Sequence, residues 1–459
     1  TLDDFKTLVQ EVHKRGLRLI MDLVVNHTSD QHPWFQEARS NPVSPYRDYF
    51  VWSDTDELYR DARIIFLDTE ESNWAWDEEA KKFYWHRFYS SQPDLNYANP
   101  AVRSEMLNII RFWLDLGIDG FRVDAVPYLF EEDGTNCENL PETHDFLRQM
   151  REFVDRNYND KVLICEANQM PEDVIAYLGN GDEFHLAFHF PVMPKIFMGL
   201  RMQNRLPIEE TLKKTPAIPE ETQWGTFLRN HDELTLEMVT PEEREWMWKE
   251  YAPEPRMRQN LGIRRRLAPL LDNNPDKIML AHRMLFSLPG TPFLYYGDEI
   301  GMGDNVELPD RNGVRTPMQW DASLNAGFSS STESWLPVIE REPYSAASVN
   351  VELQMTQGDS LWQQLQQLIS LRKNEKVFQS NEIQFVEHAD ERVLIFTRRK
   401  DKDEMLFVHN LSADEIALPR TLPVLENRKL VDLISGSEVL VNDQSHDLRL
   451  KPYQSLYLK

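Results

Sequence analysis

Three acidic residues stand at the ends of segments that are predicted to be strands. They are Asp124 in GFRVDAV, Glu166 in ICEAN and Asp232 in FLRNHDE. Cleavage of a glycosidic bond with retention of configuration needs a nucleophilic carboxylate. It also needs a carboxyl group about 5 to 5.5 Å away that first donates and then accepts a proton. Any one of these acids could equally cap the helix after its strand. All three together, with further polar residues beside them, favour a glycoside-processing site.

Arg122 stands two residues before Asp124, so the two side chains point to the same side of a strand. There Arg122 is expected to keep Asp124 ionised. Glu166 should instead have a raised pKa, so that it can donate a proton to the leaving oxygen and then act as a base. A histidine is often a hydrogen-bonded core residue. However, His27 and His231 lie at strand ends beside motif residues, which predicts a role in the site.

Alternating helices and strands must position these acids. The run LRLIMDLVVNH (17–27) is nearly all apolar, as expected of a parallel strand covered on both faces. Five more strands are predicted to end near residues 126, 168, 190, 232 and 301, and helices are predicted over 102–116, 142–158, 278–287 and 359–374. Polar residues gather just past the strands. This is typical of a (β/α)8 barrel, whose active site lies at the C-terminal strand ends.

The predicted fold class is therefore α/β, with a (β/α)8 TIM barrel over residues 1–377. Only six barrel strands can be counted, so we expect the first two strands to lie before Thr1 and to be missing from this chain. Segment 28–100, rich in Trp, Tyr, Asp and Pro, is predicted to form an inserted subdomain. The short alternating segments of 378–459 predict a C-terminal all-β sandwich domain.

Composition narrows the choice of partners. The 459 residues, 41% of them hydrophobic, suffice for a barrel and a smaller domain. Lys and Arg number 50 against 76 Asp and Glu, a net charge of −26, so neither nucleic acid nor a membrane surface is an expected partner. Cys137 and Cys165 lack metal-ligand spacing. We expect them to be free thiols in a reducing compartment, which predicts a cytoplasmic protein.

Five motifs occur in an order that resembles the α-amylase superfamily of glycoside hydrolases and transglycosylases. They are DLVVNH (22–27), QPDLN (92–96), GFRVDAV (120–126), the acid of ICEAN and FLRNHDE (227–233). Within that superfamily, segments 46–56 and 134–144 closely resemble the trehalose synthase family of maltose α-D-glucosyltransferases. Segments 227–240 and 310–320 support the same resemblance, which covers most of the chain.

The resemblance implies a role for each matching residue. Asp124 would be the nucleophile, Glu166 the general acid/base, and Asp232 the group that steadies the oxocarbenium-like transition state. The residues implied to bind the sugar are His27, Arg122 and His231 in the innermost subsite and Arg315 in the outer one.

A structural calcium ion is also implied by the resemblance. Its implied ligands are the side chains of Asn26, Asp94 and Glu131 and the carbonyl oxygens of Tyr128 and Leu129. Calcium favours such mixtures of carboxylate, amide and backbone oxygens. Without the resemblance, Asn26 could be a turn residue and Asp94 a helix cap. The ion would pin the inserted subdomain to the barrel, and no organic cofactor is expected.

The implied reaction is an intramolecular transglycosylation that interconverts maltose and trehalose through a covalent glucosyl–aspartate, with minor hydrolysis. The nearest alternative is a hydrolytic α-glucosidase acting on maltose-type substrates. The carboxylates cannot distinguish the two, because exclusion of water decides the outcome. A non-catalytic barrel is the third hypothesis, and the presence of all three acids disfavours it. The expected partner is a small disaccharide, and the sequence leaves open whether the chain forms a homo-oligomer.

Overall fold

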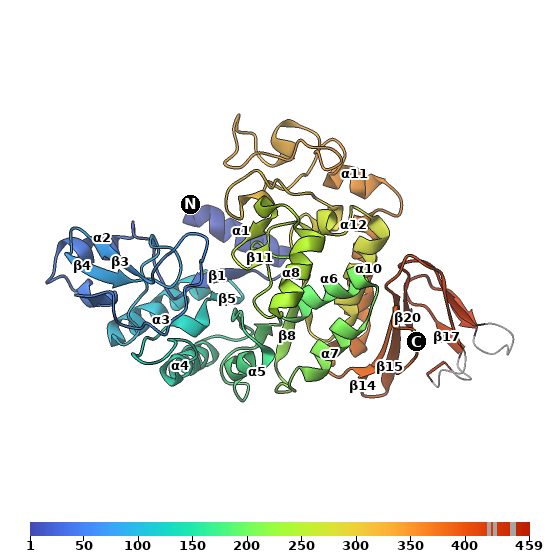
Figure 1. Cartoon of the computed structure of the whole chain (residues 1–459), viewed down its shortest axis with the longest axis horizontal. Coiled ribbons are helices and arrows are strands. Elements are labelled where there is room, and N and C mark those ends of the chain that lie inside the picture. The colour runs from blue at the N-terminus through green and yellow to red at the C-terminus, as the bar shows by residue number, and fades with distance from the viewer. Residues whose placement is uncertain (420–423, 426–428, 441–446) are drawn as a thin grey trace. The chain divides into compact units, whose positions relative to one another are not determined.

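The computed structural model describes residues 1–419, 424–425, 429–440 and 447–459 (Figure 1). It divides into two compact units, Thr1–Phe188 with Pro216–Gln223, and His189–Thr215 with Trp224–Lys459. Among the described residues, no helix combines the length and the apolar character needed to cross a membrane.

Parallel strands form the centre of the first unit. In order across the sheet they are β1 (Ile20–Val24), β5 (Gly120–Asp124), β6 (Val162–Cys165) and β7 (Leu186–Phe188). The helices of this unit are α1 (Leu2–Lys14), α2 (Pro33–Ser40), α3 (Pro100–Asp115), α4 (Pro141–Asn157) and α5 (Pro171–Val174). Local signals explain where helices begin: Thr1 and Asp4 form a capping box on α1, and the Asn99 side chain caps α3 just before Pro100.

The inserted segment has its own small antiparallel sheet. Its strands are β2 (Trp52–Ser53), β4 (Lys82–Trp85) and β3 (Trp74–Asp77), in that order. Trp74, Trp85, Ala62 and Cys137 form a buried apolar cluster beside this sheet. Several of the aromatic residues in this segment therefore pack the subdomain itself.

The second unit contains the remaining parallel strands of the α/β part, β8 (Gln223–Phe227) and β12 (Thr291–Phe293). A short antiparallel sheet consists of β10 (Arg258–Gln259), β11 (Gly262–Ile263) and β9 (Leu234–Thr235). The helices are α6 (Val192–Met202), α7 (Leu206–Lys214), α8 (Pro241–Tyr251), α9 (Leu267–Leu270), α10 (Pro275–Ser287), α11 (Val351–Thr356) and α12 (Leu361–Asn374).

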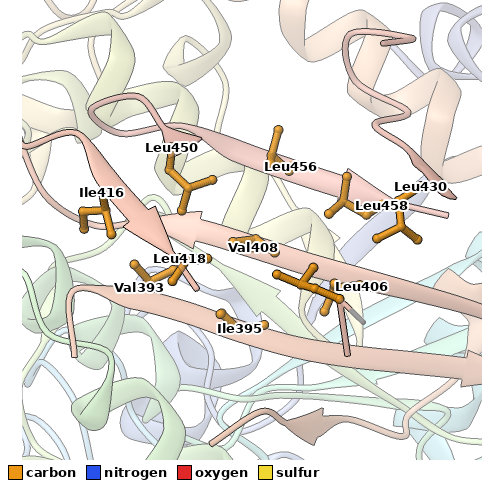
Figure 2. Packing of buried hydrophobic residues seen from close by; sticks show 11 residues of the cluster. Val393, Ile395, Leu406, Val408, Ile416, Leu418, Leu430, Leu450, Leu456 and Leu458 are labelled. Atoms are coloured by element: carbon orange, nitrogen blue, oxygen red, sulfur yellow. The ribbon is translucent and has the colours of Figure 1, made fainter. Parts of the chain in front are cut away.

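The C-terminal part of the second unit is antiparallel and all-β, as predicted. One sheet has the order β13 (Gln384–Phe385), β14 (Val393–Lys400), β15 (Asp403–Asn410) and β20 (Ser455–Leu458). The other strands pair as β16 (Ile416–Leu418) with β19 (Leu448–Leu450) and β17 (Lys429–Val431) with β18 (Glu438–Leu440). Val393, Ile395 and Leu406 of the larger sheet join side chains from the smaller ones, such as Ile416 and Leu450, in one buried cluster (Figure 2).

One expectation about the first strand was wrong. The apolar run 17–27 predicted a strand covered on both faces, but Val24 is 45% exposed and the Asp22 side chain points largely into solvent. Within the described residues β1 pairs only with β5, so it is an edge strand of its sheet. The two predicted free thiols, Cys137 and Cys165, are free and buried.

Arg398 anchors β14 to the segments packed against it. Its guanidinium is almost fully buried and donates to the carbonyl oxygens of Ser287 (2.8 Å), Leu288 (3.0 Å), Phe378 (3.3 Å) and Ser380. We expect Arg398→Met to lower the free energy of unfolding by about 2 to 4 kcal/mol, because buried carbonyls lose charged donors. Thermal and urea unfolding would measure this loss.

The neighbouring residue provides a matched control for this prediction. Arg399 is mostly exposed and pairs with Glu404 at the surface. Arg399→Met should therefore change the free energy of unfolding by no more than about 0.5 kcal/mol. Equal effects of the two substitutions would contradict the anchoring role of Arg398.

Candidate active site

The register of the first unit's sheet places two of the predicted catalytic acids side by side. Asp124 is the last residue of β5 and pairs with Val24 of β1. The next strand pairs Cys165 with Val123, and the Glu166 backbone N–H donates to the Val123 carbonyl oxygen at 3.1 Å. Asp124 and Glu166 therefore stand at the same level at the ends of adjacent strands.

A single guanidinium joins both acids. Arg122 Nη1 lies 3.0 Å from Asp124 Oδ1 and 3.0 Å from Asp22 Oδ1, and Arg122 Nη2 contacts Glu166 Oε2. The side chains of Arg122, Asp124 and Glu166 are each less than one quarter exposed. Arg122 and Asp124 therefore lie on the same side of β5, as their spacing predicted, and form an ion pair.

The contact between Arg122 and Glu166 bears on the expected acid/base role. A general acid must hold a proton, whereas an ion pair with arginine favours the charged carboxylate. The raised pKa of Glu166 stays a prediction.

His27 lies at a polar junction in the same unit. Its Nε2 is 3.1 Å from Gln92 Nε2, and its Nδ1 is 3.4 Å from Asn26 Nδ2. Burial lowers the pKa of His27 to about 4, so the imidazole is neutral near pH 7. A neutral imidazole can donate one hydrogen bond and accept another, as a sugar hydroxyl requires.

Three of the predicted calcium ligands have buried oxygen atoms without hydrogen-bond partners. They are Asn26 Oδ1, Asp94 Oδ2 and Glu131 Oε1. Burial raises the pKa of Asp94 to about 8 and that of Glu131 well above its usual value, and the charge of Asp94 raises the Glu131 pKa further. Orphaned buried oxygens are costly, and a cation would satisfy them.

The other two predicted calcium ligands are backbone carbonyls close to Glu131 in the sequence. Tyr128 and Leu129 are buried, lie in the loop after β5, and stand two to three residues before Glu131. Within the described part of the chain, no three His, Cys, Asp or Glu side chains gather as a metal site.

The third predicted acid lies in the second unit, just after β8. Asp232 Oδ1 is 2.6 Å from Arg315 Nη2 and 3.0 Å from Arg311 Nε, while Asp232 Oδ2 is 3.3 Å from His231 Nε2. Arg315 Nε also donates to the His231 carbonyl oxygen at 2.7 Å. Arg315, predicted to line the outer sugar site, therefore contacts Asp232 directly.

Sequence reasoning missed four polar residues of these sites. Asp22 and Gln92 stand inside motifs already quoted, and Glu233 directly follows Asp232. The fourth, Arg311, lies in the segment DRNGVR that carries Arg315. Strand alternation places Asp22 on the same side of β1 as Val24, but it does not show that Arg122 contacts Asp22. The partner of Arg311 could not be read from the sequence.

Sequence profiles of known families match nearly the whole chain. The profile described as alpha amylase, catalytic domain, matches residues 1–253 and 255–381. The profile described as maltogenic amylase, C-terminal domain, matches residues 383–456. These matches and the parallel strands above confirm the predicted α/β barrel fold and the all-β C-terminal domain.

Relatives of known activity are similar over most of their length. The trehalose synthase/amylase TreS of Mycolicibacterium smegmatis is 56% identical over 427 residues, which cover 90% of this chain and 72% of that protein. The trehalose synthase of Pimelobacter sp. is 53% identical over 451 residues, which cover 95% and 79%. Among solved structures, an inactive double mutant of MutB in complex with isomaltulose aligns over 100% of this chain and 86% of that one. The TM-score is 0.76 and the identity 26%.

The ordered acidic motifs, the parallel strands that present them and these similarities agree with one another. The chain belongs to the α-amylase family and, within it, to the group that contains the trehalose synthases.

Proposed function

We propose that the protein is a retaining transglycosylase that interconverts maltose and trehalose. The observation that carries the proposal is the shared guanidinium of Arg122, which brings Asp124 and Glu166 together at adjacent strand ends. Retention requires two carboxyl groups close to each other, and acids at adjacent strand ends that contact one guanidinium support such an arrangement. The similarity to trehalose synthases supports the choice of substrates.

In the proposed first step, maltose binds with its non-reducing glucose in the innermost subsite. Glu166 donates a proton to the glycosidic oxygen while an Asp124 carboxylate oxygen attacks the anomeric carbon. The bond to the leaving oxygen breaks, glucose is released into the closed site, and a glucosyl–Asp124 ester forms. Asp232 stabilises the positive charge that develops on the sugar through hydrogen bonds to its hydroxyl groups.

In the second step the freed glucose turns over inside the site. Its anomeric hydroxyl attacks the ester carbon, Glu166 accepts the hydroxyl proton, and Asp124 leaves as a carboxylate, which yields trehalose. His27, Arg122 and His231 would orient the transferred glucose, and Arg315 would help to position the second sugar. Water must be excluded during this step, because it would attack the same ester and release glucose.

Hydrolysis is the second candidate activity, and one observation favours it as a side reaction. The Mycolicibacterium relative carries the double name trehalose synthase/amylase. The same acids serve both reactions, so the ratio of the two products depends on how well water is kept out.

We also propose that a structural calcium ion binds to Asn26, Asp94 and Glu131 with the carbonyl oxygens of Tyr128 and Leu129. The orphaned buried oxygens of the three side chains support it. Such an ion would neutralise two buried carboxylates and hold the inserted segment, through Asp94, to the loop after β5. It takes no part in the chemical steps.

The covalent intermediate can be trapped. Glu166→Gln should slow turnover of maltose by about 10²- to 10⁴-fold, because no proton reaches the leaving oxygen. With α-glucosyl fluoride, whose leaving group needs little protonation, the same variant should accumulate an adduct of one glucosyl unit on Asp124, detected by mass spectrometry of the digested protein. Asp124→Asn is the control and should form no adduct. An adduct at another residue would contradict the assignment.

The products formed from maltose separate the two candidate activities. A transglycosylase should give mainly trehalose, with glucose as a minor product, and the reaction should approach the same mixture from trehalose. Chromatography of the sugars over time measures both. Glucose as nearly the sole product from maltose would instead identify a hydrolase.

Calcium binding can be tested through stability. Calcium at about 100 times its Kd stabilises a folded protein by about 2.7 kcal/mol, so chelation should lower the Tm of the parent protein by several degrees. Asp94→Asn should remove most of the response to chelator. Asp54→Asn, which changes an exposed acid of the same segment, should leave the response intact. A parent protein that holds no calcium by elemental analysis and does not respond to chelator would overturn the proposal.

A further inference from the structure

Arg311 lies between two consecutive acids of the second unit. Its Nε is 3.0 Å from Asp232 Oδ1 and 2.8 Å from Glu233 Oε2, and its side chain is 7% exposed. Its Nη1 also donates to Asp310 Oδ1 at 3.0 Å. Without such a cation, two adjacent carboxylates in a poorly solvated place would repel each other.

The other carboxylate oxygen of Glu233 has a partner of its own. Its Oε1 accepts a hydrogen bond from Asn260 Nδ2 at 3.1 Å. Gly262 packs directly against it, since a Cβ there would lie 2.6 Å from Glu233 Cγ. Strand β11 pairs with β9, which begins immediately after Glu233, so the hairpin holds both the backbone and the side chain of this region.

The segment that carries Arg311 is also fixed. Arg264 donates to the carbonyl oxygens of Leu308 (2.6 Å) and Val306 (3.1 Å) and to that of Asp310. Gly313 approaches the same segment so closely that a Cβ would lie 2.2 Å from the Asn305 carbonyl oxygen. The backbone around Arg311 is therefore held by contacts that do not involve Asp232.

Two arginines of one segment converge on the same oxygen of Asp232. Arg315 Nη2 and Arg311 Nε both contact Oδ1, while Oδ2 faces His231 Nε2. Contacts of this kind fix the rotation of the carboxylate. Burial raises the pKa of Glu233, and the charge of Arg311 opposes that rise.

We propose that Arg311 is a positioning residue for Asp232, and that Glu233 and the β10–β11 hairpin act on Asp232 through it. The inference rests on the proposed role of Asp232 in stabilising the transition state. A carboxylate that acts only at the transition state loses its effect when it is misplaced by a fraction of an ångström to about 1 Å, a displacement that can reduce the rate by about 10²-fold.

The test uses two conservative variants of the full enzyme. Arg311→Lys keeps the charge but cannot bridge both acids in the same planar geometry. We expect kcat for maltose conversion to fall by about 100-fold while KM changes by less than about threefold. Glu233→Gln should lower kcat by about 10-fold through the loosened Arg311. Arg256→Lys, an exposed arginine that pairs with Glu254 and Glu307, is the control and should leave kcat unchanged.

Additivity separates positioning from general loss of structure. If Glu233 acts through Arg311, the variant that combines Arg311→Lys with Glu233→Gln should have the same kcat as Arg311→Lys alone. The first substitution already removes the contact through which Glu233 acts on Asp232. Multiplied effects, a rise in KM with unchanged kcat, or full activity of Arg311→Lys would each overturn the inference. If Arg311→Lys does not fold, Glu233→Gln provides the test. A lower kcat with little change in KM would support the inference, and an unchanged kcat would overturn it.

Asp232→Asn distinguishes failure of this inference from failure of the proposed function. Loss of activity in Asp232→Asn together with full activity in Arg311→Lys would refute only the role of Arg311. Retained activity in Asp232→Asn would refute the role of Asp232, and the inference about Arg311 with it.

Discussion

The contact of one arginine with three carboxylates is the interaction on which the first unit's site depends. Arg122 meets Asp22, Asp124 and Glu166 from three neighbouring strands, and like charges so close together would otherwise repel. The contact exists because the sheet pairs Asp22 with Arg122 and Val24 with Asp124. A register shift of one residue would turn these side chains to the opposite face, so strand pairing is a precondition of the chemistry.

Buried or half-buried arginines perform a comparable task in the second unit. Arg264 and Arg398 each donate to several backbone carbonyls, and Arg311 contacts three carboxylates. The planar guanidinium with its five donors suits this use, because it can satisfy groups on separate segments at once. The segment 305–315 has little regular secondary structure, so these contacts, not a helix or a sheet, hold its functional arginines in place.

Much of the fold could be predicted, with errors that have physical causes. Each predicted strand and helix occurs, but strands such as β7 and β12 are shorter than their apolar runs, because residues beyond the paired segment remain apolar in turns. The coverage of β1 was predicted wrongly, since an apolar run does not reveal how many neighbours a strand has. Asp124, Glu166 and Arg122 were predicted to lie near one another, and their side chains are in contact. Glu233 and Arg311 were missed because their contact spans 78 positions of sequence.

By itself the sequence determined the types and order of the chemical groups: acids at strand ends, a histidine beside them and an arginine two residues before Asp124. These features are local, because alternation along a strand and the apolar run before each acid are properties of consecutive residues. Only the tertiary structure decided which acid each arginine neutralises and which buried oxygens lack a partner. Such pairings depend on strand register and loop paths that bring distant residues within about 3 Å, a distance that no local pattern encodes.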